Sequence, residues 1–349
     1  MHTLRIGVIG YGYWGPNLVR NFVELPNSAV VAVADLDPGR LDQVRARYPQ
    51  IKATNDYREL FRAGLDAVAI ATPPATHFAL AQEALLHGLH VLVEKPLTTA
   101  SSDAQELIRL AEDQDRVLMV GHTFLYNPAV RALKRMVDNE ELGRVYYVDA
   151  VRVSLGLFQR DLNVLWDLAP HDISILLYVL GCDPIGVSAY GASCVQYGVE
   201  DVAYMTLLFP NYCLAHLRLS WLDPCKTRRI TVVGSSKMVV YDDIQSLGKL
   251  CVYDKGVDCP PYTSTFGDFQ FAYHYGDITI PHIKLREPLQ WECSHFLECI
   301  REHKRPETDG YNGLKVVRII ETAQRSMINR GSQEQLIYEF EHQSERAVA

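Results

Sequence analysis

Short runs of apolar residues alternate with helical stretches over the first third of the chain. Five runs are typical of strands, because each is almost wholly apolar and rich in β-branched residues: 4–9, 29–34, 67–71, 90–93 and 117–121. Apolar residues recur at helical spacing after Gly15 and over residues 79–86. Continuous apolar strands separated by helices indicate a parallel sheet covered on both faces. We therefore expect a doubly wound α/β domain over residues 1–121.

From about residue 145 the pattern changes to alternation of buried and exposed positions. Residues 201–209 and 212–221 flank a Pro-Asn turn, which predicts an antiparallel hairpin. Residues 230–233 and 238–241 predict a second hairpin around a Gly-Ser-Ser turn. One face of such a sheet is buried, and the other is free for substrate or for another subunit.

Helical periodicity returns near the end of the chain, over residues 288–301 and 313–330. We therefore expect residues 122–349 to form an α+β domain with a large, mainly antiparallel open sheet, and its last helix to pack back on the first domain. The free face of the sheet predicts a homodimer or a homotetramer joined through it.

Composition excludes several classes of protein. The 349 residues are 48% hydrophobic and 22% charged, which suits two globular domains. The net charge of −8 leaves no basic surplus for nucleic acid, and no apolar run is long enough for a bilayer. The first residues lack the apolar core of a secretory signal. All eight cysteines follow Gly181 without C-x-x-C spacing, so we expect a reduced, cytoplasmic protein without a metal site.

The segment Gly-Tyr-Gly-Tyr-Trp-Gly follows the first predicted strand and opens the first predicted helix. This context is typical of the turn that holds a dinucleotide pyrophosphate in a Rossmann domain. An acidic residue ends the second strand, where it can accept hydrogen bonds from adenine-ribose hydroxyls and repel a 2′-phosphate. We expect NAD rather than NADP, a preference that Arg40 weakens slightly. The cofactor candidates here are Gly10, Gly12, Tyr13, Trp14, Gly15 and Asp35.

Three further segments carry groups suited to chemistry. Ala-Thr-Pro-Pro-Ala-Thr-His at 71–77 and Glu-Lys-Pro at 94–96 each follow a strand of the parallel sheet, at its carboxyl edge. They add Thr72, Pro73, His77, Glu94 and Lys95 to the cofactor candidates. Asp167 and His171 stand four residues apart at the start of an apolar helix and can face one way. Taken singly, each residue has a structural explanation: Lys95 as a surface lysine, Asp167 as a helix cap and His171 as a helix histidine.

In combination these motifs resemble those of the GFO/IDH/MocA (glucose–fructose oxidoreductase, inositol dehydrogenase and rhizopine catabolism) family over essentially the whole chain. The resemblance implies an NAD(P)-dependent oxidoreductase that acts on a secondary hydroxyl of a sugar or cyclitol. It assigns Lys95, Asp167 and His171 to the catalytic triad. Histidine titrates near neutrality and can take the hydroxyl proton. Asp167 would orient the imidazole, and Lys95 would stabilise the developing alkoxide.

Two segments depart from the family pattern. Leu-Asn-Val-Leu-Trp at 162–166 replaces a common run of glycines, and residues 121–128 lack the arginines of many relatives. This variant resembles the branch that oxidises C3 of a hexose in nucleotide-sugar and aminosugar biosynthesis. The substrate candidates that this resemblance implies are Tyr126, Asn127, Arg160, Asn163, Trp166 and His171. Lys226 and Arg228 are weaker candidates for a diphosphate, with sheet-edge or interface charge as the alternative.

Three alternatives stay open at this point. The first keeps the chemistry and changes the substrate to myo-inositol or another cyclitol. The second is a non-catalytic NAD-binding regulator, which would be expected to lose one of Lys95, Asp167 and His171, whereas all three are present. The third is NAD-dependent glycoside cleavage, because the same hydride transfer begins that reaction. A released aglycone would identify it.

Overall fold

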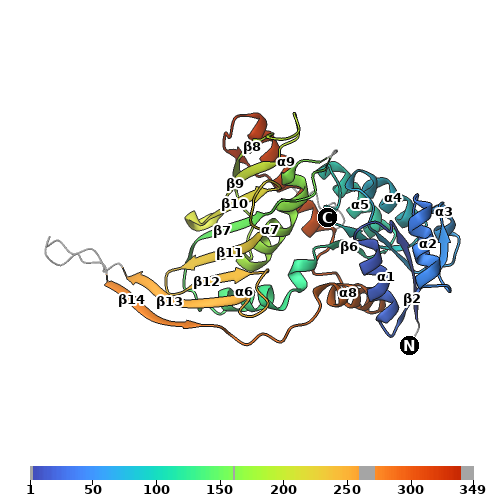
Figure 1. Ribbon diagram of the computed structural model, residues 1–349, viewed down its shortest axis with the longest axis horizontal. Helices are drawn as coiled ribbons and strands as arrows, with labels where there is room; N and C mark the ends of the chain where they lie inside the picture. The colour runs from blue at the N-terminus through green and yellow to red at the C-terminus, as the bar shows by residue number, and fades with distance from the viewer. Residues whose placement is uncertain (1–2, 160–161, 259–271, 339–349) are drawn as a thin grey trace, which may run out of the picture.

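The computed structural model describes residues 3–159, 162–258 and 272–338, and these residues contain two β-sheets (Figure 1). We call residues 3–121 the parallel-sheet region and residues 122–338 the large-sheet region. Figure 1 shows the two regions side by side, with the helix α7 on the side of the large sheet that faces the parallel-sheet region. The predicted fold class is confirmed.

The parallel-sheet region has six strands in the order β3-β2-β1-β4-β5-β6, and every neighbouring pair is parallel. The strands are β1 (Leu4–Ile9), β2 (Ser28–Ala34), β3 (Lys52–Thr54), β4 (Ala67–Ile70), β5 (His90–Glu94) and β6 (Leu118–Gly121). The helices are α1 (Gly15–Glu24), α2 (Pro38–Arg47), α3 (Arg58–Phe61), α4 (His77–Leu86) and α5 (Ser101–Asp113). The strand β3 was not predicted, because three residues are too short for a pattern to be recognised.

The large sheet has nine described strands in the order β14-β13-β12-β11-β7-β10-β9-β8-β15. They are β7 (Val145–Val153), β8 (Gly186–Ala192), β9 (Val202–Leu208), β10 (Leu214–Ser220), β11 (Thr227–Gly234), β12 (Met238–Asp242), β13 (Leu250–Asp258), β14 (Ala272–Thr279) and β15 (Glu334–Gln335). Both predicted hairpins are present, as β9–β10 and β11–β12. Only the central pair, β7 and β10, is parallel among the pairs described.

Four longer helices complete the large-sheet region: α6 (Pro128–Asp138), α7 (Val164–Leu180), α8 (Pro288–Glu302) and α9 (Gly310–Ile328). The start of α9 packs closely on the parallel-sheet region. A Cβ atom on Gly310 would lie 2.7 Å from the Ile108 side chain, and one on Gly313 would lie 2.7 Å from Val120. Just before α9, the Val120 amide donates to the carbonyl oxygen of Thr308. The end of the chain thus joins the two sheets.

The face of the large sheet opposite α7 exposes large side chains. Tyr147 lies beside Leu214 in the ladder, and Tyr204 lies beside Tyr190. Each of these four side chains is at least 40% exposed, whereas Val148, Ala189, Ala203 and Ala215, beside them along the strands, are buried. An apolar and aromatic face of this kind is typical of an interface between subunits.

We expect the protein to sediment as a homodimer or homotetramer at micromolar concentration. Replacing both Tyr147 and Tyr204 with aspartate should yield monomers, because charge would be buried without a partner at that interface. Tyr212→Asp is the matched control, since Tyr212 is exposed on the turn between β9 and β10. A wild-type protein that sediments as a monomer would contradict this prediction.

Candidate active site

The glycine-rich turn after β1 has the close packing that a dinucleotide site requires. Gly10 has φ +95°, and a Cβ there would lie 2.6 Å from the carbonyl oxygen of Ala71. A Cβ on Gly15 would lie 2.1 Å from the carbonyl oxygen of Gly10, so no side chain fits. Beside Gly12, the nearest atom is the flexible end of Arg40, and the backbone is open to a ligand. The α1 N-terminus has no side-chain cap, so its positive dipole end is open to phosphate.

Asp35 follows β2 at the same edge of the sheet. Its carboxylate accepts hydrogen bonds from the amides of Tyr11 at 2.6 Å and Asp37 at 2.8 Å. These two bonds hold the carboxylate beside the glycine turn, where ribose hydroxyls would bind. The Arg40 guanidinium lies 3.4 Å from the same carboxylate. This cation would attract a 2′-phosphate.

We expect kcat/KM to be higher with NAD+ than with NADP+, by about ten- to a hundredfold, because the carboxylate of Asp35 would face a 2′-phosphate. Arg40→Gln should widen this preference, since it removes the neighbouring cation. Arg45→Gln on the same helix is the control, because Arg45 pairs with Asp42 instead. Equal values for the two cofactors, or a preference for NADP+, would rule out this role of Asp35.

The loops after β4 and β5 are tied together by His77. Its imidazole lies between the carbonyl oxygens of Pro96, 2.8 Å from Nδ1, and Thr72, 2.9 Å from Nε2. The side chain is fully buried, which lowers its pKa. His77 therefore supports the two cofactor loops from their buried side. Pro73 is exposed on the loop, and Tyr13 is exposed on the glycine turn, where it stacks against Trp14.

The two regions meet at Lys95 and Asp167. The Lys95 ammonium donates to the backbone carbonyl of Asp167 at 2.8 Å and to its carboxylate at 3.3 Å. The second carboxylate oxygen of Asp167 accepts a hydrogen bond from the indole of Trp221 at 3.0 Å. An aspartate on α7 is thus held by a lysine from the parallel sheet and a tryptophan that follows β10. The contact fixes the ammonium at the carboxyl edge of the parallel sheet.

His171 lies one helical turn beyond Asp167, and its ring packs edge-on against Phe124 with centroids 5.1 Å apart. Its Nδ1 is buried without a hydrogen-bond partner. The expected hydrogen bond from the imidazole to the Asp167 carboxylate is therefore not made, and the two carboxylate oxygens accept from Lys95 and Trp221 instead. Burial lowers the pKa of His171 well below its usual value, and the charges of Lys95, Arg152 and Arg228 lower it further. A neutral imidazole is ready to accept a proton.

Sequence reasoning missed His122 and Glu292. His122 follows β6, one residue past the last ladder pair of Glu94 and Gly121, and both its ring nitrogens are buried without partners. Burial and the charge of Lys95 lower its pKa to about 3. Glu292 on α8 accepts a hydrogen bond from Thr123 and is also buried. Lys95 was selected because it directly follows a parallel strand, and the same rule identifies His122. Nothing in the sequence places Glu292 near these residues.

These buried groups fit the nicotinamide end of a dinucleotide. Burial raises the pKa of Glu94 to about 8 against the attraction of Lys95, and burial together with Glu94 raises that of Glu292 well above its usual value. Unpartnered polar atoms are present on His122 and Glu292. Buried polar atoms without a partner are rare. The carboxamide and the ribose at the nicotinamide end of the cofactor would supply the missing hydrogen bonds.

Two family models match consecutive parts of the chain. Residues 4–122 match "Oxidoreductase family, NAD-binding Rossmann fold", and residues 130–240 match "GFO/IDH/MocA C-terminal domain". The chain belongs to the GFO/IDH/MocA oxidoreductase family. It is accordingly an NAD-binding oxidoreductase, as the motifs predicted.

Two curated relatives align with this oxidoreductase over most of their length. UDP-N-acetylglucosamine 3-dehydrogenase of Acidithiobacillus ferrooxidans is 28% identical, over 91% of this chain and 95% of the relative. The scyllo-inositol 2-dehydrogenase (NAD(+)) of Bacillus subtilis is 27% identical, over 87% and 88%. A solved structure of the Acidithiobacillus ferrooxidans enzyme superposes with a TM-score of 0.78 at 25% identity, covering 93% of this chain and 98% of that one. GenD2 from gentamicin A biosynthesis, in complex with NAD, shares the fold with a TM-score of 0.81 at 20% identity, covering 97% of each chain.

The substrate candidates of this oxidoreductase lie in different surroundings. Tyr126 is fully buried with its hydroxyl against Thr308, and Asn127 caps α6 and donates to the Tyr241 hydroxyl. We leave both out of the proposal below, since their polar groups already bind protein. Arg160 lies outside the described residues. Asn163 and Trp166 lie at the start of α7, beside a cavity of about 330 Å³. Their polar groups bind protein too, because Asn163 donates to Glu200 and Trp166 donates to Gln324, so we leave them out as well. His171 is the candidate described above.

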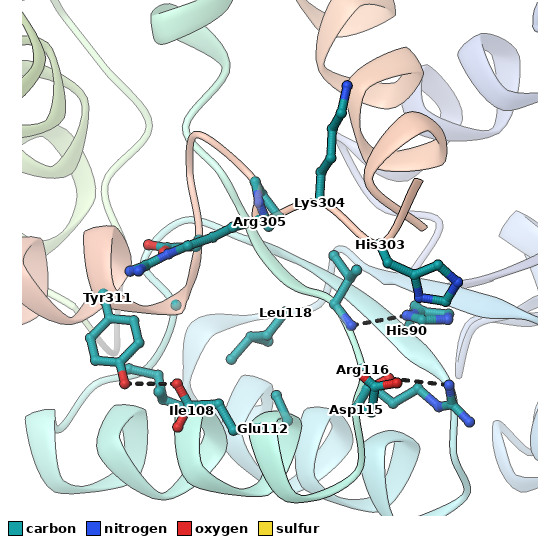
Figure 2. A pocket seen from close by; sticks show the side chains of 15 residues that line it. His90, Ile108, Glu112, Asp115, Arg116, Leu118, His303, Lys304, Arg305 and Tyr311 are labelled. Atoms are coloured by element: carbon teal, nitrogen blue, oxygen red, sulfur yellow. Dashed lines mark hydrogen bonds and ion pairs between the residues drawn. The ribbon is translucent and has the colours of Figure 1, made fainter. Parts of the chain in front are cut away.

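A separate cavity of about 270 Å³ lies at the opposite edge of the parallel sheet (Figure 2). It is lined by the first residues of β5 and β6 and by the segment between α8 and α9. Figure 2 shows His90 and Arg116 on one side and Tyr311 against Glu112 on the other. Dinucleotides bind at the carboxyl ends of parallel strands. This cavity is therefore not the cofactor site of the oxidoreductase.

Two other findings concern the described part of the chain. None of its helices combines the length and the apolar character of a membrane span. Within the same residues, no three histidine, cysteine, aspartate or glutamate side chains gather as a metal site requires.

Proposed function

We propose that this oxidoreductase uses NAD+ to oxidise a secondary hydroxyl, at C3, of a hexose in a nucleotide sugar or an aminosugar precursor. The observation that carries the proposal is the contact of Lys95 with Asp167, which joins the cofactor edge of the parallel sheet to the helix bearing His171. The similarity to a UDP-N-acetylglucosamine 3-dehydrogenase over nearly the full length supports this substrate class. We propose Gly121 as the boundary between the cofactor domain and the substrate domain.

The proposed chemistry divides between cofactor and protein. When held by the glycine turn and Asp35, NAD+ would supply the acceptor for the hydride of the carbinol carbon. The hydroxyl proton passes to Nε2 of His171, because Nδ1 is buried and the ring is neutral at pH 7. Lys95 donates a hydrogen bond to the same oxygen and stabilises the negative charge that develops there. Asp167 positions the lysine, and Phe124 packs on the ring of His171 and limits its movement.

A panel of substrates tests the proposal. UDP-N-acetylglucosamine, other UDP-sugars, free hexoses, aminosugars and cyclitols would be supplied with NAD+, and NADH absorbance would be followed. The ketone product would be sought directly by mass spectrometry, so that bound NADH does not hide a turnover. Oxidation of a nucleotide sugar or aminosugar at C3 is the expected result. Oxidation of cyclitols alone would reject the proposed substrate.

A cyclitol is the second candidate substrate, and a specific observation favours it. Two of the relatives are inositol dehydrogenases, the scyllo-inositol enzyme described above and a Myo-inositol 2-dehydrogenase of Thermotoga maritima, which is 23% identical over 94% of this chain. The two candidates differ in charge, because a nucleotide sugar carries a diphosphate and a cyclitol is neutral.

A further inference from the structure

Two arginines lie directly opposite each other in the middle of the large sheet. Arg152 on β7 pairs with Arg228 on β11 in the antiparallel ladder. Both alternate with buried residues of their strands, such as Ala150 and Ile230, and so both point to the face covered by α7. Like charges at directly opposed positions destabilise a sheet. Each cation therefore needs a partner or a function.

Arg152 has a complete partner. Its guanidinium forms two hydrogen bonds to Asp172 on α7, at 2.8 and 2.9 Å, and both side chains are almost fully buried. Phe124 covers the guanidinium from one side. The charge of Arg152 is thus neutralised within the protein, and its donors are directed at a protein carboxylate.

Arg228 has only a partial partner. Its guanidinium lies 3.7 Å from the carboxylate of Asp243, beyond hydrogen-bond distance. That carboxylate also accepts from the ammonium of Lys249 at 3.4 Å and from the hydroxyl of Tyr241 at 3.1 Å. One carboxylate thus serves two cations, and the Arg228 side chain is 39% exposed. A guanidinium has five donors in a planar fork. Most of the five donors of Arg228 are therefore available to a ligand.

The position of Arg228 relates it to the catalytic cluster. Its cross-strand neighbour Arg152 reaches Asp172, the residue after His171, and the Arg228 charge contributes to the lowered pKa of His171. Three cations act on this histidine: Lys95, Arg152 and Arg228. Lys95 pairs with Asp167 and Arg152 pairs with Asp172, each at 3.3 Å or less. Arg228 has only the more distant Asp243, which it shares with Lys249.

We propose that Arg228 is a specificity-determining residue that binds an anionic group of the substrate, a phosphate or a carboxylate, a short distance from the oxidised carbon. The proposal rests on the proposed function and narrows its substrate class to charged sugars. A planar guanidinium suits such a group, because it can form two parallel hydrogen bonds to phosphate or carboxylate oxygens. A neutral cyclitol offers no anionic group to this guanidinium, so its N–H donors would stay bound to water.

The test compares Arg228→Gln with Arg229→Gln, a matched control one residue away. Arg229 points to the opposite face of the sheet and pairs with Asp242. With a nucleotide sugar, Arg228→Gln should raise KM about ten- to a hundredfold with little change in kcat, since charge-assisted hydrogen bonds are lost. The KM for myo-inositol, measured on the pH plateau, should change far less than the KM for the nucleotide sugar. Arg228→Lys should recover part of the loss, because it keeps the charge without the fork.

A binding measurement separates this proposal from the proposed function. Calorimetry with UDP and with glucuronate, on the NAD-loaded protein, should show weaker binding of at least one of them in Arg228→Gln and unchanged binding in Arg229→Gln. Loss of UDP binding identifies a phosphate site, and loss of glucuronate binding alone identifies a carboxylate site. If nucleotide sugars are not oxidised but UDP binding still requires Arg228, the proposed function fails and the anion site stands. Equal affinities in the two variants, or no binding of either anion to the wild-type protein, would overturn the proposal.

Discussion

Replacing His171 with asparagine is expected to lower kcat by about 10²–10⁴, the usual effect of removing a positioned acid–base group. Binding of NAD+ should be retained, because the glycine turn and Asp35 belong to the parallel-sheet region. The half-buried ring packs on Phe124, and asparagine leaves space there, so the thermal unfolding of the variant must be compared with that of the wild type. Turnover with saturating NAD+ gives kcat, and a fluorescence titration gives the affinity for NAD+.

His282→Asn is the control for this experiment, because His282 is exposed on the segment between β14 and α8. Lys95→Ala should lose turnover by a similar order, and the two losses should not add fully in the double variant, since both groups act on one oxygen. A His171→Asn variant with a rate near that of the wild type would show that the histidine is only a packing residue. The base would then have to be sought elsewhere.

The pH profile follows from the surroundings of His171. Oxidation requires the unprotonated ring, so kcat/KM should rise with pH through the pKa of His171 and then level off. Burial and three neighbouring cations lower this pKa well below 6.5, so the rising limb should lie in the acid range, below the neutral range that an ordinary histidine would give. Profiles of kcat/KM from acid to neutral pH would measure it. The limb should disappear in His171→Asn and move to higher pH in Arg228→Gln.

Breaking the buried ion pair of Arg152 and Asp172 is expected to destabilise the protein by about 3–5 kcal/mol. Arg152→Leu leaves the Asp172 carboxylate buried without its two hydrogen bonds, and this uncompensated charge is the main cost. The loss should be clear as a lower midpoint of urea unfolding. Replacing both residues, as Arg152→Met with Asp172→Leu, should recover part of the stability, because no buried charge remains.

The exposed pair of Arg45 and Asp42 is the control for stability. Arg45→Gln should change the free energy of unfolding by less than about 1 kcal/mol, as is usual for surface ion pairs. An Arg152→Leu variant that unfolds at the wild-type urea concentration would show that water reaches the pair. The positioning of α7 against β7 would then depend on apolar packing alone.

The sequence predicts the fold well where an apolar pattern repeats along the chain. It does not predict contacts that depend on residues far away in the sequence. Apolar runs locate five of the six parallel strands, and residues directly after a strand, such as Lys95, are placed at the correct edge. Asp167 and His171 do lie on one helix, yet the carboxylate turns to Lys95 and Trp221, which are 72 and 54 residues away. Arg152 is hidden in the middle of a strand, and only the register of β7 against β11 brings it beside Arg228.

Hydride transfer from C3 of the sugar to the cofactor can be followed with an isotopic label. UDP-N-acetylglucosamine carrying deuterium at C3 would be incubated with NAD+ and stoichiometric enzyme, and the cofactor would be released by denaturation and weighed by mass spectrometry. Denaturation recovers the cofactor whether or not NADH leaves the site. We expect one deuterium in the NADH formed by the wild-type protein, and almost none with His171→Asn in the same time. Recovery of unlabelled cofactor from the wild-type protein, with the substrate unchanged, would contradict it.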